Sequence, residues 1–358
     1  MGRPPLKQRA ILADLRRKIV SGVYPPGSRL PTRLELHRHY QASLATVQVV
    51  LDRLARDGFV TARGRQGTHV VDNPPHLSTL ALLFPRLEAD ASFSRNWSSL
   101  AKAAREHNAA QARRPGGFRF DLRFGYGARA GRPDVVEGLE SDLADHLFAG
   151  LIFASTMRSL KGSPLLATPR VPRVAFIAIH PDEAFPHLAR IQYDIRQMTE
   201  QVFALFAGQG RRRLAVINTD VHENALNGQI ASIAAGFGLE LPPYRHLLST
   251  CASAKGIRNT AHLLLRLPEG DRPDCIFVAH DDLVESATLG FLDAGAHALD
   301  GVSLAVHCNF PDPAPQAVPA IRIGFDARAA MERAMEEIRH QAAGNPPRDS
   351  VLPSHIRE

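Results

Sequence analysis

The stretch between residues 30 and 71 constrains the fold of this chain more than any other. Thr32 can cap a first short helix, which is expected to end near Tyr40. After a three-residue turn, Ser43 can cap a second helix that runs to about Asp57. The spacing therefore predicts two helices joined by a tight turn.

The second predicted helix is apolar on one side only. Its large apolar residues are three or four positions apart, so one stripe contains Val47, Val50, Leu51 and Leu54. The outward side then carries Leu44, Ala45, Gln48 and Asp52. This outward side is free to enter a groove of DNA.

A hairpin is predicted directly after the helices. Gly58 is expected to end the second helix. Residues 59–62 and 68–71 then pair as strands across the Gly-rich run 63–67. A hairpin beside a helix pair forms a wing, so the N-terminal part is predicted to be a winged helix-turn-helix of the α+β class.

From about Lys7 to Val71 the chain resembles the winged helix-turn-helix of the GntR family of bacterial transcription regulators. The resemblance rests on IVSGVYPPGSRLPT before the helix pair and on DRLARDGFV and GRQGTHV after it. It implies binding to operator DNA. The family usually places arginines where this sequence has Leu34, Leu44 and Gln48, so the family's detailed base contacts do not transfer.

The helix pair and the hairpin supply the expected DNA contacts. A glutamine such as Gln48 can pair with N6 and N7 of adenine, a contact worth about 1–3 kcal/mol. Arg63 and Arg65 in the hairpin are expected at phosphates or in the minor groove. The residues predicted to bind DNA are Thr32, Arg33, Ser43, Leu44, Ala45, Thr46, Gln48, Arg53, Arg63, Arg65, Gln66 and Gly67.

The positive charge of the chain is concentrated in its N-terminal part. The formal net charge is +7 for the whole chain. Residues 1–76 contain 13 Lys and Arg against 5 Asp and Glu, a net charge of +8, whereas the other residues contain 30 against 31. A basic module suits DNA phosphates, and a near-neutral one suits a small molecule or a protein partner. A basic face that only aids solubility is the alternative.

The three cysteines, Cys251, Cys275 and Cys308, are far apart and have no metal-binding or redox spacing. We expect buried thiols in a reducing compartment, and we expect neither a metal nor a cofactor. No apolar run approaches the roughly 20 residues of a membrane span, and the N-terminus lacks a signal-peptide core. A cytoplasmic protein without membrane contact is therefore expected.

A domain boundary is predicted after the hairpin. Residues 72–76, Asp-Asn-Pro-Pro-His, are expected to continue neither a strand nor a helix. We therefore divide the chain into a DNA-binding domain at 1–72, a linker at 73–77 and a second domain at 78–358. Within the first domain, an additional helix is predicted from the apolar face of Ile11, Leu12, Leu15 and Ile19.

In the second domain, predicted strands alternate with predicted helices, as in a doubly wound sheet. A first series has strands at 80–84, 118–124, 150–154 and 174–179 and helices at 97–107 and 134–148. A second series has helices at 195–208, 225–237, 255–267 and 283–294 and strands at 214–218, 244–248, 275–279 and 303–307. A strand at 320–325 and a helix at 327–342 are expected to return to the first series, before a polar tail.

This order resembles the effector-binding core of the LacI/GalR regulators, which is similar to periplasmic sugar-binding proteins. The resemblance rests on LALLFP, IQYDIRQMTEQVFALFAGQGRRRLAVIN, DCIFVAHDDLVESATLGFLDAG, VSLAVHCNFPD and AIRIGFDARAAMERAMEEI. It implies a two-lobed α/β domain that binds an effector and dimerises. The family commonly has an arginine ligand contact in the helix that corresponds to 225–237, where this chain has Ala-Leu-Asn-Gly-Gln at 225–229.

Effector contacts are expected where strand ends face the boundary between the lobes. Asp281 could accept hydrogen bonds from ligand hydroxyls or cap the next helix, although Asp282 is the more expected cap. Trp97 could stack on a sugar ring or pack in the core. The residues predicted at this site are Asn96, Trp97, Ser155, Thr156, Asp281 and Asn309.

The sequence indicates no enzyme. It contains no GxSxG, HExxH or P-loop motif, and the adjacent residues His280, Asp281 and Asp282 are expected to point in different directions. We predict a dimeric regulator that binds an inverted-repeat operator and responds to a small polar molecule of the saccharide type. The alternatives are a second domain that binds no ligand and only dimerises or recruits a protein, and an enzyme with DNA-linked regulation.

Overall fold

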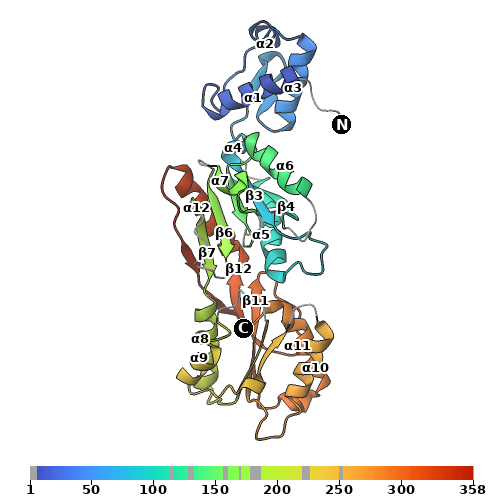
Figure 1. Cartoon of the computed structure of the whole chain (residues 1–358), viewed down its shortest axis with the longest axis vertical. Helices are drawn as coiled ribbons and strands as arrows, with labels where there is room; N and C mark the ends of the chain where they lie inside the picture. Colours follow the sequence, from blue (N-terminus) through green and yellow to red (C-terminus); the bar gives the residue numbers. More distant parts are fainter. Residues whose placement is uncertain are drawn as a thin grey trace.

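The structure is a computed structural model that describes residues 6–112, 117–127, 133–155, 160–168, 171–177, 187–219, 226–249 and 253–357. A small N-terminal domain, a first α/β lobe and a second α/β lobe follow one another along the long axis of the molecule (Figure 1). The first lobe lies between the other two parts. This order places it where it can connect a DNA-binding domain to the second lobe.

The N-terminal domain has the predicted helix pair. It consists of α1 (Leu6–Val20), α2 (Arg33–Tyr40), α3 (Leu44–Arg56), β1 (Val60–Ala62) and β2 (Thr68–Val70). Thr32 and Ser43 are the N-caps of α2 and α3, and their side chains accept hydrogen bonds from backbone N–H groups three residues ahead. The buried residues of α3 are the predicted stripe of Val47, Val50, Leu51 and Leu54.

The wing is a short antiparallel hairpin, as predicted. Val60 lies opposite Val70, and the connection is one 3-10 turn, η1 (Gly64–Gln66). An isolated antiparallel β-bridge between Arg29 and His69 pairs one further residue with the hairpin. Gly67 has a φ of +92°, and a Cβ there would lie 2.9 Å from Nε of Arg29. Glycine at this position therefore lets the Arg29 side chain pack directly on the wing.

A one-turn helix, α4 (Pro75–Ser78), begins inside the stretch that was expected to be irregular. The expectation that this stretch forms no helix is wrong. Proline is tolerated at the first helical position, because its missing N–H would have no partner there. The helix leads directly into the first strand of the α/β lobes.

The first lobe has a parallel sheet with the strand order β13-β7-β6-β5-β3-β4. Its strands are β3 (Thr79–Phe84), β4 (Arg119–Phe124), β5 (Gly150–Phe153), β6 (Arg173–Ile177), β7 (Ala189–Tyr193) and β13 (Ser350–Leu352). Its helices are α5 (Arg95–Gln111), α6 (Pro133–Ala144), α7 (Pro164–Ala167) and α12 (Ala327–Ala342). Every residue of β3 is buried, which explains its continuous apolar run.

The second lobe has a sheet with the order β14-β12-β11-β10-β8-β9, in which only β14 is antiparallel to its neighbour. Its strands are β8 (Leu214–Thr219), β9 (His246–Ser249), β10 (Cys275–Val278), β11 (Ser303–Phe310), β12 (Ile321–Asp326) and β14 (His355–Arg357). Its helices are α8 (Ile195–Gly208), α9 (Ile230–Gly236), α10 (Ala254–Leu264) and α11 (Asp281–Asp293), with 3-10 turns η4 (Pro243–Arg245) and η5 (Ala296–Leu299).

Three expectations about the placement and the bounds of elements are wrong. The strand near residue 321 was expected in the first lobe, but β12 pairs with β11 in the second. The polar tail forms two strands, because β13 pairs with β7 and β14 pairs with β12. Helix α9 begins at Ile230 rather than near 225, since Asn227 before it bonds to the Asn218 amide and the Thr219 carbonyl oxygen of β8.

The chain crosses between the lobes at three neighbouring points in the described residues: from β7 to α8, from β12 to α12 and from β13 to β14. The Asp194 N–H donates to the Leu352 carbonyl oxygen at 3.0 Å, which ties the first crossing to the third. Nη2 of Arg357 donates to Asp326 at 2.8 Å, which ties the second crossing to the tail. The three crossings form one hinge.

None of the helices in the described ranges is long and apolar enough to cross a membrane. Both cysteines within these ranges, Cys275 and Cys308, are buried free thiols, as expected, whereas Cys251 lies outside them. Burial raises the pKa of the Cys308 thiol to about 12, so this group stays protonated. These two cysteines act as core residues.

The packing of α10 against α11 gives a test of the fold. A Cβ at Gly290 would lie 2.1 Å from the Arg258 carbonyl oxygen, whereas one at Gly138 in α6 would meet nothing within 4 Å. Gly290→Ala should lower the free energy of unfolding by about 1–3 kcal/mol, and the control Gly138→Ala should raise it by about 0.5–1 kcal/mol. Urea unfolding followed by circular dichroism measures both. A Gly290→Ala protein as stable as the wild type would contradict the close helix packing.

Candidate DNA-binding face and interlobe site

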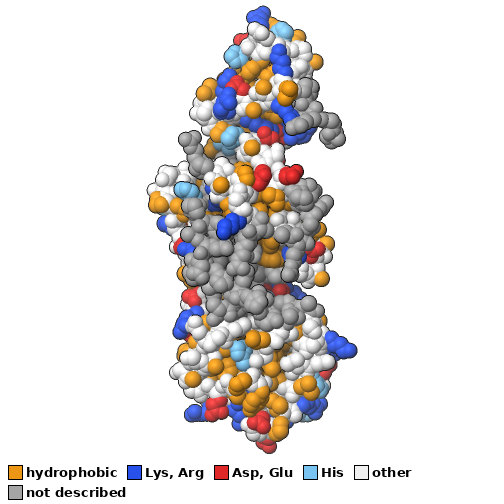
Figure 2. Space-filling model, in the orientation of Figure 1, with side chains coloured by type: hydrophobic (Ala, Val, Ile, Leu, Met, Phe, Trp, Pro, Cys, Tyr) orange, Lys and Arg blue, Asp and Glu red, His pale blue; other side chains and the backbone are white. Residues whose placement is uncertain are grey.

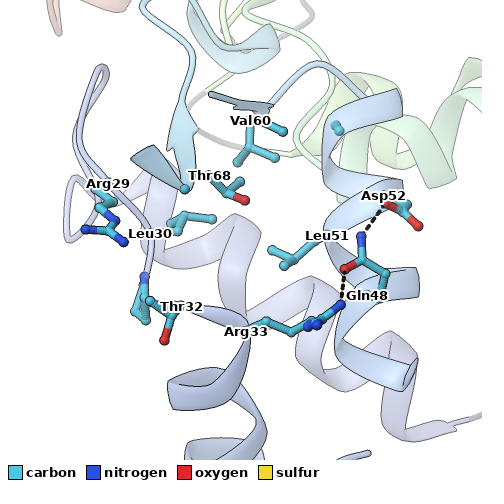
Figure 3. A pocket seen from close by; sticks show the side chains of 13 residues that line it. Arg29, Leu30, Thr32, Arg33, Gln48, Leu51, Asp52, Val60 and Thr68 are labelled. Atoms are coloured by element: carbon cyan, nitrogen blue, oxygen red, sulfur yellow. Dashed lines mark hydrogen bonds between the residues drawn. The ribbon is translucent and has the colours of Figure 1, made fainter. Parts of the chain in front are cut away.

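A hollow of about 310 Å³ lies between the start of α2, the outward side of α3 and the wing (Figure 3). Its polar lining comes from Arg29, Thr32, Arg33, Gln48, Asp52 and Thr68. Four of the predicted DNA-binding residues, Thr32, Arg33, Gln48 and Gly67, therefore lie around one concave surface. The sequence interpretation did not include Arg29, which only the fold brings next to the Gly-rich wing.

The hollow contains a chain of hydrogen-bonded side chains (Figure 3). Nη1 of Arg33 donates to Oε1 of Gln48 at 3.1 Å, and Nε2 of Gln48 donates to Oδ1 of Asp52 at 2.8 Å. Both ends of the Gln48 amide are thus bonded within the protein. Each end of the Gln48 amide keeps one further position, so pairing with adenine uses the second lone pair of Oε1 and the second hydrogen of Nε2.

The two N-cap residues have a structural role at the same surface. Hydrogen bonds from Thr32 to the Glu35 carboxylate lower the pKa of Glu35, and the Glu35 N–H donates back to the Thr32 hydroxyl at 3.3 Å. The Ser43 hydroxyl accepts from the Thr46 N–H at 3.0 Å. These caps fix the starts of α2 and α3, where exposed backbone N–H groups favour phosphate.

The other residues predicted to bind DNA lie outside the hollow. Leu44 and Ala45 are exposed on the first turn of α3, and Arg63, Arg65 and Gln66 are exposed on the wing. Nε of Arg53 instead donates to Asp57 at 3.0 Å, at the end of α3. The structure therefore directs Arg53 toward the C-terminal end of the helix.

At the boundary between the lobes, polar side chains from both lobes come together. Nδ2 of Asn309 donates to Oδ2 of Asp281, and both residues are buried. The Tyr193 hydroxyl donates to Oδ1 of Asn96 at 3.2 Å. Asn309 was expected just after its strand but lies inside β11, which extends to Phe310. Ser155 follows β5 as expected, and Thr156 lies outside the described residues.

The Trp97 side chain packs toward the core of the first lobe. Its Nε1–H donates to the Ala154 carbonyl oxygen at 3.0 Å, and its ring contacts Phe93 edge-on at 5.6 Å between centroids. The indole N–H therefore already has a partner. Of the two roles considered for Trp97, this geometry matches core packing.

The start of α11 differs from the sequence interpretation. His280, and not Asp282, is the N-cap, because its Nδ1 accepts from the Asp282 N–H at 3.3 Å. Oδ1 of Asp282 instead accepts from the Arg95 N–H at 2.9 Å and joins the second lobe to the first. Burial, followed by the charge of Asp281, raises the pKa of Asp282.

A ring nitrogen of His280 and one carboxylate oxygen each of Asp281 and Asp282 lie within 4.8 Å of one another. The expectation that these side chains point apart is therefore wrong. Each of them already has a partner within the protein: the Asp282 N–H for His280, Asn309 for Asp281 and the Arg95 N–H for Asp282. Of these three bonds, the one from Arg95 to Asp282 crosses between the lobes, and the other two lie within the second lobe. The sequence interpretation considered His280 but did not name it as a site residue, and it missed Tyr193 and His307, since β7 was not predicted and His307 had no motif.

The fold defines a class: a winged helix-turn-helix joined to a two-lobed α/β domain of the periplasmic-binding-protein type. Residues 7–70 match the family model described as bacterial regulatory proteins, gntR family. The chain is 33% identical over 67 residues to an uncharacterized HTH-type transcriptional regulator, YdfD, of Bacillus subtilis strain 168. That match covers 19% of this chain and 14% of the relative, so the chain spans only a small part of the relative's length.

Two solved structures are similar to the chain in fold. A regulatory protein of the LacI family from Chloroflexus aggregans has a TM-score of 0.57 at 17% identity, over 78% of this chain and 96% of that one. The complex of the transcriptional regulator CelR with cellobiose has a TM-score of 0.59 at 17% identity, over 99% of each chain. The N-terminal domain is therefore a GntR-type winged helix-turn-helix, and the second domain has the fold of LacI-family regulators. Both predicted resemblances are confirmed.

The buried His307 gives a test of this region. Burial, followed by the charge of His280, lowers its pKa from 6.5 to about 3, so the folded protein keeps it neutral. The unfolded chain binds a proton below about pH 6.5, so the stability contributed by a neutral His307 is complete above that pH and is lost as the pH falls toward 3. When the pH falls from about 7.5 to about 5, the free energy of unfolding should therefore decrease by about 2 kcal/mol less in His307→Gln than in the wild type.

Thermal unfolding midpoints at the two pH values measure this difference. The control is His297→Gln, because the His297 side chain is 99% exposed. The control should follow the wild type at both pH values. An equal acid-induced loss in His307→Gln and in the wild type would show that His307 is not held neutral.

Proposed function

We propose that this protein is a sequence-specific DNA-binding transcription regulator whose operator affinity is changed by a small polar molecule. The observation that carries the proposal is the hollow between α2, α3 and the wing, which is open in the full chain. It lies in the part of the sequence that has a net charge of +8. A concave basic surface next to a helix N-terminus suits a DNA backbone and the edges of its bases.

For base recognition, we propose that Arg33, Gln48 and Asp52 act as one unit. Arg33 uses one guanidinium N–H on Gln48 and keeps further donors for a base, and arginine is the usual reader of guanine. Asp52 holds the other end of the Gln48 amide. In this arrangement Gln48 either orients Arg33 toward guanine or itself pairs with adenine, and these two possibilities predict different base preferences.

The effector is proposed to bind between the lobes. Asp281 and Asn309 from the second lobe, and Asn96 with Tyr193 from the first, offer a carboxylate, two amides and a phenol. Such groups suit a ligand with several hydroxyls, and one similar structure is described as a complex with cellobiose. A saccharide or a related polar molecule is therefore the proposed class, with Ser155 and Thr156 as further contacts.

One observation favours the alternative, in which the second domain binds no ligand. Asp281 already bonds to Asn309 and Asn96 to Tyr193, each within one lobe, so a ligand has to compete with these bonds. In that case the domain only dimerises or recruits a protein. We propose no catalytic role, because the matched family model describes regulatory proteins.

We also propose a homodimer that binds an inverted repeat. One winged helix reads a short half-site, and a two-fold partner supplies the second one. Hydrophobic side chains gather on the face of the second lobe seen in Figure 2. Large exposed apolar residues of this lobe are Tyr244, Leu248, Leu263 and Leu292, and β9 is an open sheet edge in the described structure. These features support pairing through the second lobe.

The DNA-binding proposal predicts distinct effects for the α3 face and the wing. Gln48→Ala and Arg33→Ala should relax base preference at the same base pair, because the two side chains are bonded. Arg65→Ala should weaken binding to all sequences and reduce the salt slope by about 1, as expected for a phosphate contact. Fluorescence anisotropy on single-base operator variants at several salt concentrations separates these effects. If Gln48→Ala weakens every variant equally, Gln48 has no part in base recognition.

The effector proposal predicts reciprocal coupling. A ligand that changes operator affinity by about 1–3 kcal/mol must have its own affinity changed by the same factor when DNA is bound. Calorimetry of the full chain against a panel of monosaccharides and disaccharides, cellobiose included, measures this with and without operator. Asp281→Ala should abolish ligand binding while leaving DNA binding in the absence of ligand intact. No binding across the panel would favour the ligand-free alternative, and unchanged binding in Asp281→Ala would remove Asp281 from the site.

A further inference from the structure

A buried charge lies where the N-terminal domain meets the first lobe. The Arg16 side chain in α1 is 1% exposed. It forms ion pairs with Asp57, the C-cap of α3, and with Asp145, just after α6 in the first lobe. One of its carboxylate partners therefore belongs to its own domain, and the other belongs to the neighbouring lobe.

The burial of Arg16 makes both partners important. A buried guanidinium is costly unless its charge is compensated, and removing one partner of a buried pair is strongly destabilising. Nε of Arg16 is buried without a hydrogen-bond partner, and Nη1 contacts Asp145 as an ion pair without hydrogen-bond geometry. Compensation therefore depends on the two carboxylates, and Asp145 can provide its share only while the domains are docked.

Apolar packing surrounds the ion pairs. Leu147 is partly buried and packs against the core of the first lobe and against the core of the winged helix. The Phe59 ring stacks on His76 at 6.1 Å between centroids, and the guanidinium of Arg16 lies 5.7 Å from the Phe59 ring centre. The contact thus joins residues of α1, the end of α3, α4 and the end of α6 around Arg16.

The neighbouring histidines add no positive charge at neutral pH. Burial lowers the pKa of His76 to about 4. Burial, followed by the charge of Arg16, lowers the pKa of His146. Both rings are therefore neutral, so Arg16 meets the carboxylates Asp57 and Asp145 without competition from these two side chains.

The docked contact leaves the DNA-binding face available. The hollow is lined by residues such as Arg33, Gln48 and Thr68, none of which takes part in the contact around Arg16. Asp57 lies at the C-terminal end of α3, whereas Gln48 lies in its N-terminal half. The winged helix can therefore bind DNA while it stays fixed to the first lobe.

We propose that Arg16 is a positioning residue that locks the winged helix onto the first lobe through Asp145, so that the lobes set the separation of the two winged helices in a dimer. This inference rests on the proposed function as a dimeric DNA-binding regulator. Its consequence is that operator affinity depends steeply on the spacing between half-sites. A movement of the lobes then changes the half-site spacing that the dimer prefers.

The first test measures domain geometry without DNA. Spin labels at the exposed positions 10 and 110, introduced as Ala10→Cys and Ala110→Cys in α1 and α5, report the distance between the domains by pulsed electron paramagnetic resonance. The wild-type background should give one narrow distance distribution, and Asp145→Ala should broaden it. The control is Glu137→Ala, which removes an exposed carboxylate from α6 and should leave the distribution narrow. A broad distribution in the wild-type background would overturn the proposal, even if Asp145→Ala does not fold.

The second test measures spacing dependence. The probes are duplexes carrying two copies of the half-site that this chain selects from random DNA, with the separation changed one base pair at a time, and a duplex with a single half-site. Wild type and Glu137→Ala should lose at least tenfold in affinity away from the best spacing. Asp145→Ala should vary less than about threefold, with unchanged affinity for the single half-site. A steep profile in Asp145→Ala would overturn the positioning role, whereas failure of the wild type to select any half-site would instead contradict the proposed function.

Discussion

The three neighbouring crossings of the chain between the lobes are the constraint on which the rest of the structure depends. Each crossing passes directly from a strand of one sheet into an element of the other lobe, at Asp194, Asp326 and Ser354. Because hydrogen bonds tie the crossings together, the lobes can turn about this hinge but cannot slide freely past each other. The two six-stranded sheets can then move as rigid bodies.

Contacts between the lobes oppose such turning. Asp282 at the start of α11 accepts the Arg95 N–H of α5, and the Arg95 side chain pairs with Glu285 at 2.6 Å. Lys102 of α5 pairs with Asp312, which follows β11, at 2.8 Å. Because the side chains of the Arg95–Glu285 and Lys102–Asp312 pairs are about half-exposed, each pair contributes little free energy. A ligand that adds bonds between the lobes can therefore change their arrangement, even if it binds one arrangement with only a modestly better free energy than the other.

The N-terminal domain could be predicted almost completely from sequence, because its signals are local. A hydroxyl residue before each helix, the apolar spacing of α3 and the glycines of the wing each act within a few residues. The departure came just after this domain, where the pair Pro74-Pro75 was taken as an interruption although Pro75 begins α4.

The α/β lobes were predicted less completely, because their order is fixed by pairing between distant residues. The strands β13 and β14 were missed, since each has three residues and lies in a polar tail whose partners are more than 30 residues away. The strand β7 was also missed, although it is as long as β6. Asp281 and Asn309 were each identified as site residues, but their direct bond follows from how α11 and β11 meet in space. The cap of α11 was misassigned because a histidine, a rare capping residue, takes that place.

The central claim is that this chain recognises a defined DNA sequence through its winged helix. Selection of bound duplexes from random DNA by the full chain, followed by sequencing, tests this claim most directly. The account predicts enrichment of an inverted repeat, and in Arg33→Ala a loss of preference at one base pair of each half-site. Binding that depends on salt alone and enriches no sequence would contradict it.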